Sequence, residues 1–468
     1  MSIYREYDIR GVFQQDLDEE IVFNIGLELA KEIKENGRDS IAIGYDARTH
    51  GNILFEWLTN GIATQNINIY NLGVIPTPIA YFSLYQELKI IKDVDDKTTK
   101  VDSSIMITGS HNPKEYNGFK ITLFKEPFFG KKIKALEYRI KNNRQKPIAP
   151  NKNIYNVNAL DLYISFLTKH FEHLKNFKYP ISIDCGNGVA GIAIKDILDN
   201  LNIKYYPLFF SPNGEFPNHH PDPSEEKNLE SIKQNMSKNN IKIGIAFDGD
   251  ADRLALIVNQ HTLKGDELAI LFAKKMKRDG LNPIIIGEVK CSQIMYDEIN
   301  NIGRAIMFKT GHSNLKVKLK EVNAHLAAEM SGHMFFNDRY FGFDDAIYSS
   351  FRALELFLDS SIEEVLNDIN SLPKIFSTPE EKIESSENEK FKIIEKLALK
   401  LNSPLTNFPK IIDVITIDGL RIIFEDGWGL IRASNTTPTL VTRFEANSKD
   451  KLILYKQAVL NLVKEVQS

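Results

Sequence analysis

Hydrophobic and polar positions repeat along most of the chain in the order strand, loop, helix, strand. The first copy runs from the apolar segment Ile41–Gly44 through an amphipathic stretch at 53–63 to a second apolar run at Asn66–Tyr70. The same order returns after Pro180 and again after Pro283. Short apolar strands that are joined through helices are typical of parallel sheets covered on both faces. The pattern therefore predicts three related α/β domains.

The pattern changes towards the C-terminus. Polar segments at 142–158 and 372–390 are predicted to be the first and the last linker. Beyond the last one, 428–433 and 440–446 are predicted strands around a Ser-Asn-Thr-Thr-Pro loop. In the closing helix, apolar positions from Leu452 to Val466 alternate in steps of three and four, which gives one buried face. The predicted domains are 1–155, 156–257, 258–370 and 371–468.

Composition and charge exclude several classes of function. At roughly 100–200 residues per domain, the 468 residues correspond to three or four domains. With 58 Lys and Arg against 62 Asp and Glu, the net charge is −4, so the basic excess of a nucleic-acid or anionic-membrane binder is missing. No apolar run approaches the ~18–20 residues of a membrane span. Charges at the N-terminus and only two cysteines favour a cytoplasmic protein without disulfides.

An acidic turn follows one of the apolar strands. It places Asp248, Asp250 and Asp252 at alternate positions, where their carboxylates can converge on a hard divalent cation. An EF-hand loop is excluded, because it requires Gly and Glu where this chain has Arg253 and Asn259. An aspartate-nucleophile phosphatase also has a D-x-D turn after a strand, but the third Asp and the Arg argue against it. A merely solvated turn is disfavoured, because three crowded carboxylates repel one another without a cation.

A second turn, Thr108–Pro113, lies between the apolar run 104–107 and a predicted strand at 119–124. Its Gly and Pro force a sharp bend that is expected to present Ser110 to solvent at a strand end. Ser, Asn and Pro also make ordinary turns, so this motif alone is weak. Lys120 follows an Asn-Gly pair and can fold back beside Ser110 as a proton-transfer group or a phosphate counter-charge. The alternative is a solvated strand lysine.

Two later clusters suit a sugar phosphate. Glu329–His333 combines a carboxylate, a hydroxyl and an imidazole within five residues, and Lys309–His312 lies upstream. Carboxylates accept hydrogen bonds from vicinal sugar hydroxyls, while His and Lys supply proton or phosphate contacts. Arg432–Pro438, with Arg443 close by, offers a guanidinium group, hydroxyls and backbone amides. This second set suits a phosphate monoester.

The segment Gly186–Gly191 matches the G-x-G-x-x-G fingerprint of dinucleotide-binding folds. That fingerprint requires an acidic residue at the end of the next strand, which is predicted at 203–210. Ser211, Pro212 and Asn213 follow that strand instead. We therefore interpret the segment as a tight structural turn.

The motifs, in this order, resemble those of the α-D-phosphohexomutase superfamily, in particular the bacterial phosphomannomutase/phosphoglucomutase group. The resemblance spans almost the whole chain, and its matching segments are Tyr7–Gly11, Thr108–Pro113, Asp248–Arg253, Lys309–His312, Glu329–His333 and Arg432–Pro438. It implies three related α/β domains with mixed sheets plus a smaller C-terminal α+β domain around a central cleft. Ala251 and Ala328 stand where that family more often has Gly, and the acidic stretch 93–102 is interpreted as a surface insertion.

The resemblance also implies roles for individual residues. Ser110 would carry the phosphoryl group, Arg253 would assist the transfer, and three further groups would surround the moving proton. The expected catalytic residues are Ser110, Lys120, Arg10, His333 and Arg253. The expected ligands of Mg²⁺ are Ser110, Asp248, Asp250 and Asp252. Glu329 and Ser331 would hold sugar hydroxyls. The non-reacting phosphate would be held by Tyr7, Lys309, His312, Arg432, Ser434, Asn435 and Thr436.

The implied activity is the reversible interconversion of hexose 1-phosphate and hexose 6-phosphate, with mannose, glucose or both as the sugar. It would proceed through a phosphoserine and a hexose 1,6-bisphosphate, with Mg²⁺ as cofactor and the fourth domain as a lid that excludes water. Hexose phosphates would be its partners, without nucleic acid or membrane, and the chain would be a monomer or a weak homo-oligomer.

Three alternatives to this activity stay open. They are a phosphoglucosamine mutase, a Mg²⁺-dependent sugar phosphatase and a non-catalytic sugar-phosphate-binding protein. Met330 favours the hexose mutases over the glucosamine branch. The intact serine, aspartate turn and lysine argue against a non-catalytic protein.

Overall fold

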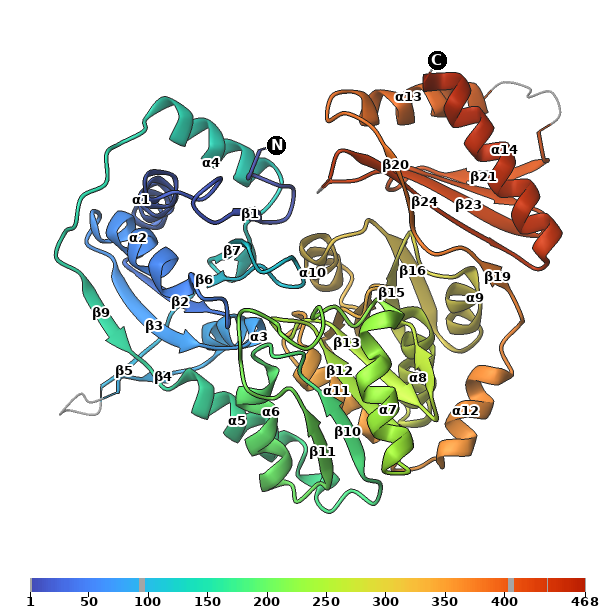
Figure 1. The fold of residues 1–468 in the computed structure, drawn as a ribbon, viewed down its shortest axis with the longest axis horizontal. Coiled ribbons are helices and arrows are strands. Elements are labelled where there is room, and N and C mark those ends of the chain that lie inside the picture. Colours follow the sequence, from blue (N-terminus) through green and yellow to red (C-terminus); the bar gives the residue numbers. More distant parts are fainter. Residues whose placement is uncertain (1, 92–96, 403–407, 436, 468) are drawn as a thin grey trace.

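Four larger sheets follow one another along the chain (Figure 1). The computed structural model describes residues 2–91, 97–402, 408–435 and 437–467. Residues 92–96 of the predicted acidic insertion therefore lie outside the described residues, and the described remainder includes the short strand β5 (Thr98–Thr99), which pairs with β4 (Leu88–Lys89). None of the helices within the described residues is both long enough and apolar enough to span a membrane.

The first sheet has the order β1-β7-β6-β2-β3-β9, with β8 beside β7. Its strands are β1 (Ile9–Val12), β2 (Ser40–Tyr45), β3 (Asn68–Val74), β6 (Ser104–Ile107), β7 (Tyr116–Leu123), β8 (Glu126–Pro127) and β9 (Asn153–Asn156). The helices of this region are α1 (Glu19–Glu35), α2 (Gly51–Ala63), α3 (Thr77–Phe82) and α4 (Lys131–Asn142).

The second and third sheets have the orders β11-β10-β12-β13-β14 and β16-β15-β17-β18. The second region comprises α5 (Ala159–His170), β10 (Ile181–Asp184), α6 (Ala190–Asn200), β11 (Tyr205–Leu208), α7 (Glu230–Lys238), β12 (Ile243–Phe247), β13 (Leu254–Val258) and β14 (His261–Leu263). The third comprises α8 (Gly265–Arg278), β15 (Ile284–Glu288), α9 (Gln293–Ile302), β16 (Arg304–Phe308), α10 (His312–Glu321), β17 (Leu326–Ala328), β18 (Met334–Phe336), α11 (Ala346–Glu355) and α12 (Ile362–Asn370).

The first three sheets share one arrangement of four strands. In each, three neighbouring strands run parallel and a fourth returns antiparallel. The three sets are β3-β2-β6-β7, β11-β10-β12-β13 and β16-β15-β17-β18. The sheets are mixed because the third strand of each set turns straight back through a short loop, and such a hairpin produces an antiparallel neighbour. Three related α/β domains with mixed sheets are thereby confirmed.

The fourth sheet has the order β19-β24-β23-β22-β21, with β20 also paired to β24. Its elements are β19 (Phe376–Ser377), β20 (Glu381–Glu384), α13 (Glu389–Leu401), β21 (Ile411–Ile415), β22 (Leu420–Phe424), β23 (Gly427–Ala433), β24 (Thr439–Ala446) and α14 (Lys449–Gln467). Every pairing in it is antiparallel, and α14 buries Tyr455, Val459, Leu462 and Val466. This is the predicted smaller α+β domain.

Both predicted linkers contain strands. The segment 372–390 forms β19 and β20, and the segment 142–158 contains β9, which pairs with β3. β9 is exposed at every position, and β20 is at most half-buried. Such strands lack the continuous apolar run that marks a buried strand, so their sequence is that of a loop.

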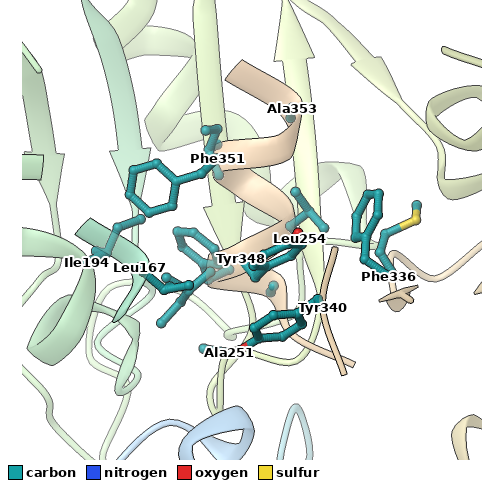
Figure 2. Close-up of a cluster of buried hydrophobic side chains, with 14 of the residues drawn as sticks. Leu167, Ile194, Ala251, Leu254, Phe336, Tyr340, Tyr348, Phe351 and Ala353 are labelled. Carbon is teal, nitrogen blue, oxygen red and sulfur yellow. The ribbon is translucent and has the colours of Figure 1, made fainter. Parts of the chain in front are cut away.

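One hydrophobic cluster continues from the first domain through the third. Figure 2 shows a part of it around α11, where Tyr348 and Phe351 lie close to Leu167 and Ile194 of the second domain. All ten residues of α11 are buried. The second and third domains therefore share a core, which gives the loops above it a rigid base.

Candidate active site

Four loops carry many of the predicted site residues, and the first three of these loops occupy equivalent positions in their sheets. The serine loop (108–115) joins β6 to β7, the aspartate loop (248–253) joins β12 to β13, and the sugar loop (329–333) joins β17 to β18. Each therefore connects the third parallel strand of its sheet to the antiparallel fourth. The phosphate loop (434–438) joins β23 to β24. The repeated fold thus supplies one equivalent loop from each of the first three domains.

Arg48 holds the serine loop in place, and its side chain is fully buried. Its guanidinium donates to the carbonyl oxygens of Ser110 (2.8 Å), Asn112 (2.7 Å), Pro113 (2.6 Å) and Tyr116 (3.0 Å). A Cβ on Gly109 would meet the Arg48 guanidinium carbon at 2.4 Å, so only glycine leaves room for this insertion. One arginine thereby fixes the path of the whole loop.

Asp46 completes the support of the serine loop. Its Oδ2 accepts from Thr108 Oγ1 at 2.7 Å and pairs with Arg48 Nε at 3.2 Å. Thr108 Oγ1 in turn accepts from the Ser110 amide at 2.8 Å, and Ser110 has a left-handed backbone with φ of 49°. A non-glycine residue in this region costs about 1–2 kcal/mol and persists only where its surroundings impose it.

Ser110 forms one of the contacts between the first and second domains and is buried there, so the expectation that it faces solvent is wrong. Its Oγ donates to Asp248 Oδ2 at 3.0 Å and lies 3.1 Å from His111 Nδ1. Burial lowers the pKa of His111 well below its ordinary value, and the nearby cations Arg253 and Arg10 lower it further. The predicted nucleophile and one predicted metal ligand are thus in direct contact, beside a neutral imidazole.

Lys120 lies on β7 and points to the aspartate loop. Its ammonium donates to Asp250 Oδ2 at 2.6 Å and also to Asp252. Burial alone would lower the pKa of Lys120, but the two carboxylates raise it above its ordinary value. Thr77 Oγ1 donates to the same Asp250 oxygen at 2.5 Å. The structure therefore brings Lys120 to the carboxylates as their counter-ion.

The aspartate loop fits a divalent cation. One oxygen from each of Asp248, Asp250 and Asp252 lies within 4.8 Å of the others, and all three residues are fully buried. Burial, together with Asp252 and Asp250, raises the pKa of Asp248 well above its ordinary value. The Oδ1 atoms of Asp250 and Asp252 are buried without a hydrogen-bond donor within the described residues. Carboxylate oxygens are the ligands that Mg²⁺ prefers, and these two have no other partner among the described residues.

Ala251, which stands where glycine was expected, has a left-handed backbone with φ of 62°. Figure 2 shows it at the edge of the hydrophobic cluster, below Tyr340. The alanine therefore keeps the loop conformation that glycine would adopt. Its backbone oxygen accepts from the amide of Ala346 at 3.2 Å, which ties the aspartate loop to α11.

Arg253 and His333 link the second and third domains. Arg253 Nε donates to His333 Nε2 at 2.9 Å. The other ring nitrogen of His333 lies 3.4 Å from Asp344 Oδ2 and 3.7 Å from Asp252 Oδ1. Glu329 Oε2 lies 3.9 Å from His333 Nε2, so His333 is surrounded by one cation and three carboxylates.

The sugar loop is ordered by Glu329. Its Oε1 accepts from the Gly311 amide at 2.7 Å, and its Oε2 accepts from Ser331 Oγ at 3.3 Å. Glu288 at the end of β15 accepts from the Met330 amide at 3.1 Å. Burial raises the pKa of Glu288 to about 7, although Lys290 lowers it. Glu329 and Ser331, the predicted sugar-binding pair, are therefore in contact, and the carboxyl group of Glu288 contacts Met330 between them.

The phosphate loop meets the first and third domains through Tyr7. Tyr7 OH donates to Thr310 O at 2.8 Å and accepts from Asn435 Nδ2 at 2.7 Å. Arg432 pairs with Asp418 at 3.1 Å, and the same carboxylate accepts from the Thr310 amide. Three domains therefore converge at this point.

The other predicted phosphate ligands lie around the same point. The His312 ring lies with its centroid 6.0 Å from that of Tyr7, Ser434 is buried, and Lys309 is exposed. Lys390 Nζ donates to the carbonyl oxygens of Ser434 at 2.6 Å and Thr437 at 3.0 Å. Thr436 lies outside the described residues.

Arg10 lies on β1, on the first-domain side of the site. Its guanidinium donates to Asn112 Oδ1 at 2.9 Å and to Asp8 Oδ2 at 2.6 Å. The arginine is therefore attached to the serine loop through Asn112, and the carboxylate of Asp8 partly compensates its charge.

The fourth domain contacts the third domain at the turn that follows β15. Arg421 is fully buried, donates to Val289 O at 2.7 Å and Cys291 O at 2.8 Å, and lies over the Trp428 ring at 3.8 Å. Ser292 Oγ donates to Glu445 Oε1 at 3.0 Å. This turn carries Lys290, so the position of the fourth domain and that of Lys290 are coupled.

The G-x-G-x-x-G segment packs against the aspartate loop. The Val189 amide donates to Gly249 O at 3.1 Å, and a Cβ on Gly188 would meet that oxygen at 2.5 Å. Asn187 has φ of 58° and donates through Nδ2 to Ser211 O at 3.0 Å. These contacts fit the structural turn expected from the sequence.

Several residues at the site were missed by sequence reasoning. They are Asp46, Arg48, His111, Glu288, Lys290, Lys316, Asp344, Lys390 and Asp418. Asp46 and Arg48 directly follow a strand that lies beside β6, and His111 belongs to the serine motif, so these three carried a usable signal. Asp344 and Asp418 belong to no motif, and their positions depend on the tertiary fold.

Comparisons with known proteins agree along the whole chain. Descriptions of phosphoglucomutase/phosphomannomutase domains match in order: alpha/beta/alpha domain I at residues 1–147, domain II at 161–262, domain III at 264–372 and the C-terminal domain at 388–462.

Individual relatives match over similar lengths. The chain is 37% identical to a phosphomannomutase/phosphoglucomutase of Pseudomonas aeruginosa over 100% of this chain and 96% of that protein. It is 36% identical to a phosphoglucomutase of Neisseria meningitidis over 96% of this chain and 94% of that protein. The crystal structure of a phosphoglucomutase/phosphomannomutase family protein from Burkholderia thailandensis superposes with a TM-score of 0.87 at 34% identity, covering 99% of this chain and 97% of that one.

Proposed function

The chain belongs to the phosphoglucomutase/phosphomannomutase family of α-D-phosphohexomutases, and on this premise we propose how its residues move the phosphoryl group. It is a phosphohexomutase, which interconverts hexose 1-phosphate and hexose 6-phosphate. We propose that mannose and glucose phosphates are both substrates, since its relatives carry both names.

Ser110 carries the phosphoryl group in this proposal. The contact that supports it most is the one between Ser110 Oγ and Asp248 Oδ2, because it joins the nucleophile to the acidic loop. The phosphoserine gives its phosphoryl group to the free hydroxyl of the hexose monophosphate. The resulting 1,6-bisphosphate turns over, and its other phosphate returns to Ser110.

His333 is the best-placed acceptor for the proton of the attacking hydroxyl. Its Nε2 accepts a hydrogen bond from Arg253 Nε, so that nitrogen carries no hydrogen, and it becomes free to take the hydroxyl proton when Arg253 turns to the phosphoryl group. Lys120 is engaged by two carboxylates, and a guanidinium group such as that of Arg10 offers only hydrogen-bond donors. We therefore assign the proton to His333 Nε2 and charge compensation to Lys120, Arg253 and Arg10.

Asp248, Asp250 and Asp252, together with Ser110, would hold one Mg²⁺. When bound, the ion would supply Lewis-acid polarisation of the phosphoryl oxygens. The unpaired Oδ1 atoms of Asp250 and Asp252 support this assignment.

The sugar and the distant phosphate are bound by the third and fourth domains. Glu329 and Ser331 accept from and donate to sugar hydroxyls. The phosphate that does not react is held by Tyr7, Lys309, His312, Arg432, Ser434, Asn435 and Thr436. We propose that the fourth domain closes over the bound substrate, since its contacts to the rest of the site run through Tyr7 and the turn that carries Lys290.

The predicted domain limits, 1–155, 156–257, 258–370 and 371–468, remain part of the proposal. The four sheets support the number and order of the domains, and the pairing of β14 with β13 favours a limit after residue 263 between the second and third. A monomer or weak homo-oligomer is also proposed, because one chain supplies every residue that the mechanism uses. A cytoplasmic location remains an expectation from the sequence.

One experiment separates the proposed function from its alternatives. Conversion of mannose, glucose and glucosamine 1-phosphates would be measured with added Mg²⁺ and hexose 1,6-bisphosphate, alongside release of inorganic phosphate. We expect isomer formation from mannose and glucose substrates with little phosphate release. Preference for the glucosamine substrate indicates a phosphoglucosamine mutase, and phosphate as the main product indicates a phosphatase.

The role of Ser110 is tested by intact-mass analysis. The wild-type enzyme should carry one phosphate, which Ser110→Ala loses together with nearly all turnover. Ser103→Ala is the matched control, because Ser103 is buried just before β6 and donates to Asp102 instead. A Ser110→Ala enzyme with near wild-type rate would contradict the mechanism.

A further inference from the structure

Lys390 is a fully buried lysine of the fourth domain that belongs to none of the sequence motifs. It is the second residue of α13, and its ammonium contacts the phosphate loop (434–438). A lysine is almost never fully buried unless its ammonium is paired, because an unpaired charge is strongly disfavoured away from water. The partners of this ammonium therefore show what the residue does.

The ammonium of Lys390 binds two peptides of the phosphate loop. Nζ donates to Ser434 O at 2.6 Å and to Thr437 O at 3.0 Å, and it pairs with Glu387 Oε2 at 2.7 Å. An ammonium has three N–H donors, and here all three have an acceptor within the fourth domain. Lys390 therefore has no donor left for a substrate and can act on one only through the loop.

The contact with Lys390 fixes the direction of the peptide between Ser434 and Asn435. None of the described peptide bonds is cis, and in a trans peptide the N–H points opposite to the C=O. Because Ser434 O points to Lys390, the Asn435 N–H points away from α13. The Asn435 side chain donates to Tyr7 OH of the first domain at 2.7 Å, so Asn435 lies where the domains converge.

The second contact removes no donor from the loop. Thr437 O also accepts from the Thr439 amide at 2.9 Å, and the residue that follows Thr437 is Pro438, which has no N–H. Ser434 Oγ accepts from the Thr437 amide at 3.1 Å, which closes the loop. The loop is therefore fixed on both sides of Asn435, while the amide of Asn435 points outward.

The charge of Lys390 favours the same arrangement. A cation at a carbonyl oxygen polarises the peptide, so the N–H of that peptide becomes a stronger donor. Outward-pointing backbone N–H groups bind phosphate in many protein sites. The carboxylate of Glu387 compensates only part of the charge, because its side chain is 46% exposed and therefore also hydrated.

We propose that Lys390 is a positioning residue, which turns the peptide between Ser434 and Asn435 so that the Asn435 amide donates to the phosphate that does not react. The role rests on the proposed function, in which the phosphate loop and Arg432 hold that phosphate. It adds to that function a buried cation that acts on the phosphate through one peptide and does not contact it.

Three substitutions separate this role from a general loss of charge. Lys390→Met keeps the length of the side chain and removes its three donors. Glu387→Gln removes a charge from the same cluster and leaves both contacts of Lys390 with the loop. Arg432→Ala removes a predicted phosphate ligand directly and therefore tests the phosphate site itself.

The test uses the full-length enzyme in a Ser110→Ala background, which is expected not to turn over, with glucose 6-phosphate as the probe. The Asn435 amide signal is followed in ¹H–¹⁵N spectra of protein labelled with ¹⁵N-asparagine, and its loss in Asn435→Gln assigns it. We expect the probe to move this signal downfield in the background enzyme and in Glu387→Gln. In Lys390→Met the signal should not respond, and the dissociation constant from titration calorimetry should rise roughly ten- to hundred-fold.

The contrary results differ in what they overturn. An Asn435 signal that does not respond in the background enzyme, while calorimetry detects binding, would overturn the proposal without any Lys390 variant. An affinity that Lys390→Met preserves and Arg432→Ala weakens would overturn it as well. A lower thermal midpoint in Lys390→Met with unchanged affinity would show a merely structural role. An affinity that neither substitution changes would remove the loop from the phosphate site, and would contradict the proposed function together with this role.

Discussion

Lys120 Nζ lies 2.6 Å from Asp250 Oδ2, and both side chains are buried. The lysine comes from β7 of the first domain and the aspartate from the second domain. This ion pair therefore joins the strand that follows the serine loop to the loop that would hold Mg²⁺. Removing one partner of a buried ion pair leaves the other charge uncompensated, which typically costs about 3–5 kcal/mol. Lys120 contacts the Oδ2 atoms of Asp250 and Asp252, and a metal ion on their unpaired Oδ1 atoms would compete with the ammonium for the charge of the same two carboxylates. Cation binding is therefore expected to release Lys120 towards the phosphoryl group.

The first prediction follows from this competition. Lys120→Met should lower the thermal midpoint in the presence of chelator, and added Mg²⁺ should restore more of it than it adds to the wild type, because the ion replaces the missing ammonium. Differential scanning calorimetry with and without Mg²⁺ makes the comparison. Lys125→Met, which removes an ammonium that lies over Tyr85, is the control. Equal Mg²⁺ shifts in Lys120→Met and wild type would exclude a shared site.

The second prediction concerns the aspartates themselves. Asp250→Asn should weaken the Mg²⁺ dependence of turnover and lower kcat, because it removes one ligand charge while keeping the side-chain size. Turnover measured across a Mg²⁺ titration, with the chelator-treated enzyme as its starting point, gives both quantities. Activity that persists in excess chelator would show that the cation assignment is wrong.

The third prediction tests the support of the serine loop. Arg48→Met would leave four carbonyl oxygens without their donor, and each unsatisfied buried group costs about 1–3 kcal/mol. Residues 108–116 should then exchange amide hydrogens faster, and both the phosphate on Ser110 and kcat should fall. Arg139→Met, which breaks pairs with Glu28 and Glu32 on α1, is the control. Unchanged exchange in the serine loop would contradict this role of Arg48.

The fold was predictable where strands are buried on both faces. The runs Ile41–Gly44 and Ile284–Gly287 are inner strands of their sheets and entirely apolar, so the sequence shows them directly. Ile181–Asp184 is also an inner strand, and its two isoleucines alternate with Ser182 and Asp184. β9 and β20 are exposed edge segments with polar sequences, and they were predicted as linkers. Their strand character comes from pairing with β3 and β24, which depends on the tertiary fold.

The candidate site was predictable where its groups are close in sequence. Ser110 and the three aspartates belong to short motifs, whereas Arg48 and Asp418 contact residues that other elements bring to them. Lys120 was predicted to be a group beside Ser110, and the structure brings its ammonium to Asp250 and Asp252. Such a contact depends on how two domains dock, which local sequence does not encode.

The fourth prediction concerns the pH dependence of stability. Burial raises the pKa of Asp345 to about 7, although its three donors, Tyr163 OH, Tyr340 OH and the Tyr348 amide, lower it. In the unfolded chain the pKa is near 4, so between about pH 4 and pH 7 the folded state holds a proton that the unfolded state has lost. The stability contributed by this group is therefore complete below pH 4 and is lost as the pH rises through 7.

Thermal midpoints measured from pH 5 to pH 8 test whether the stability contributed by Asp345 falls as the pH rises. The wild type should lose more stability over this range than Asp345→Asn, because the amide cannot ionise. Parallel curves for the two proteins would mean that Asp345 is ionised in the folded state at neutral pH.

The last prediction concerns Arg432, which Asp418 holds at 3.1 Å next to the Thr310 amide. A charge-assisted contact to a phosphate is worth roughly 1.5–3 kcal/mol, or about one to two decades in affinity. Distant binding energy of this kind also orients the reacting hydroxyl, so its loss appears in turnover as well as in KM. Since the bisphosphate presents each phosphate to this loop in turn, Arg432→Ala should weaken binding and turnover in both directions.

Steady-state kinetics from the 1-phosphate and from the 6-phosphate, together with X-ray scattering of the free and substrate-bound enzyme, test this prediction. Asp418→Asn is the informative companion, because it releases the guanidinium without removing it and should therefore raise KM less than Arg432→Ala does. A defect in only one direction would contradict a single site that accepts both orientations of the sugar. Unchanged rates in both directions would exclude Arg432 from the phosphate site, and a scattering profile that still contracts with substrate would show that closure does not depend on this arginine.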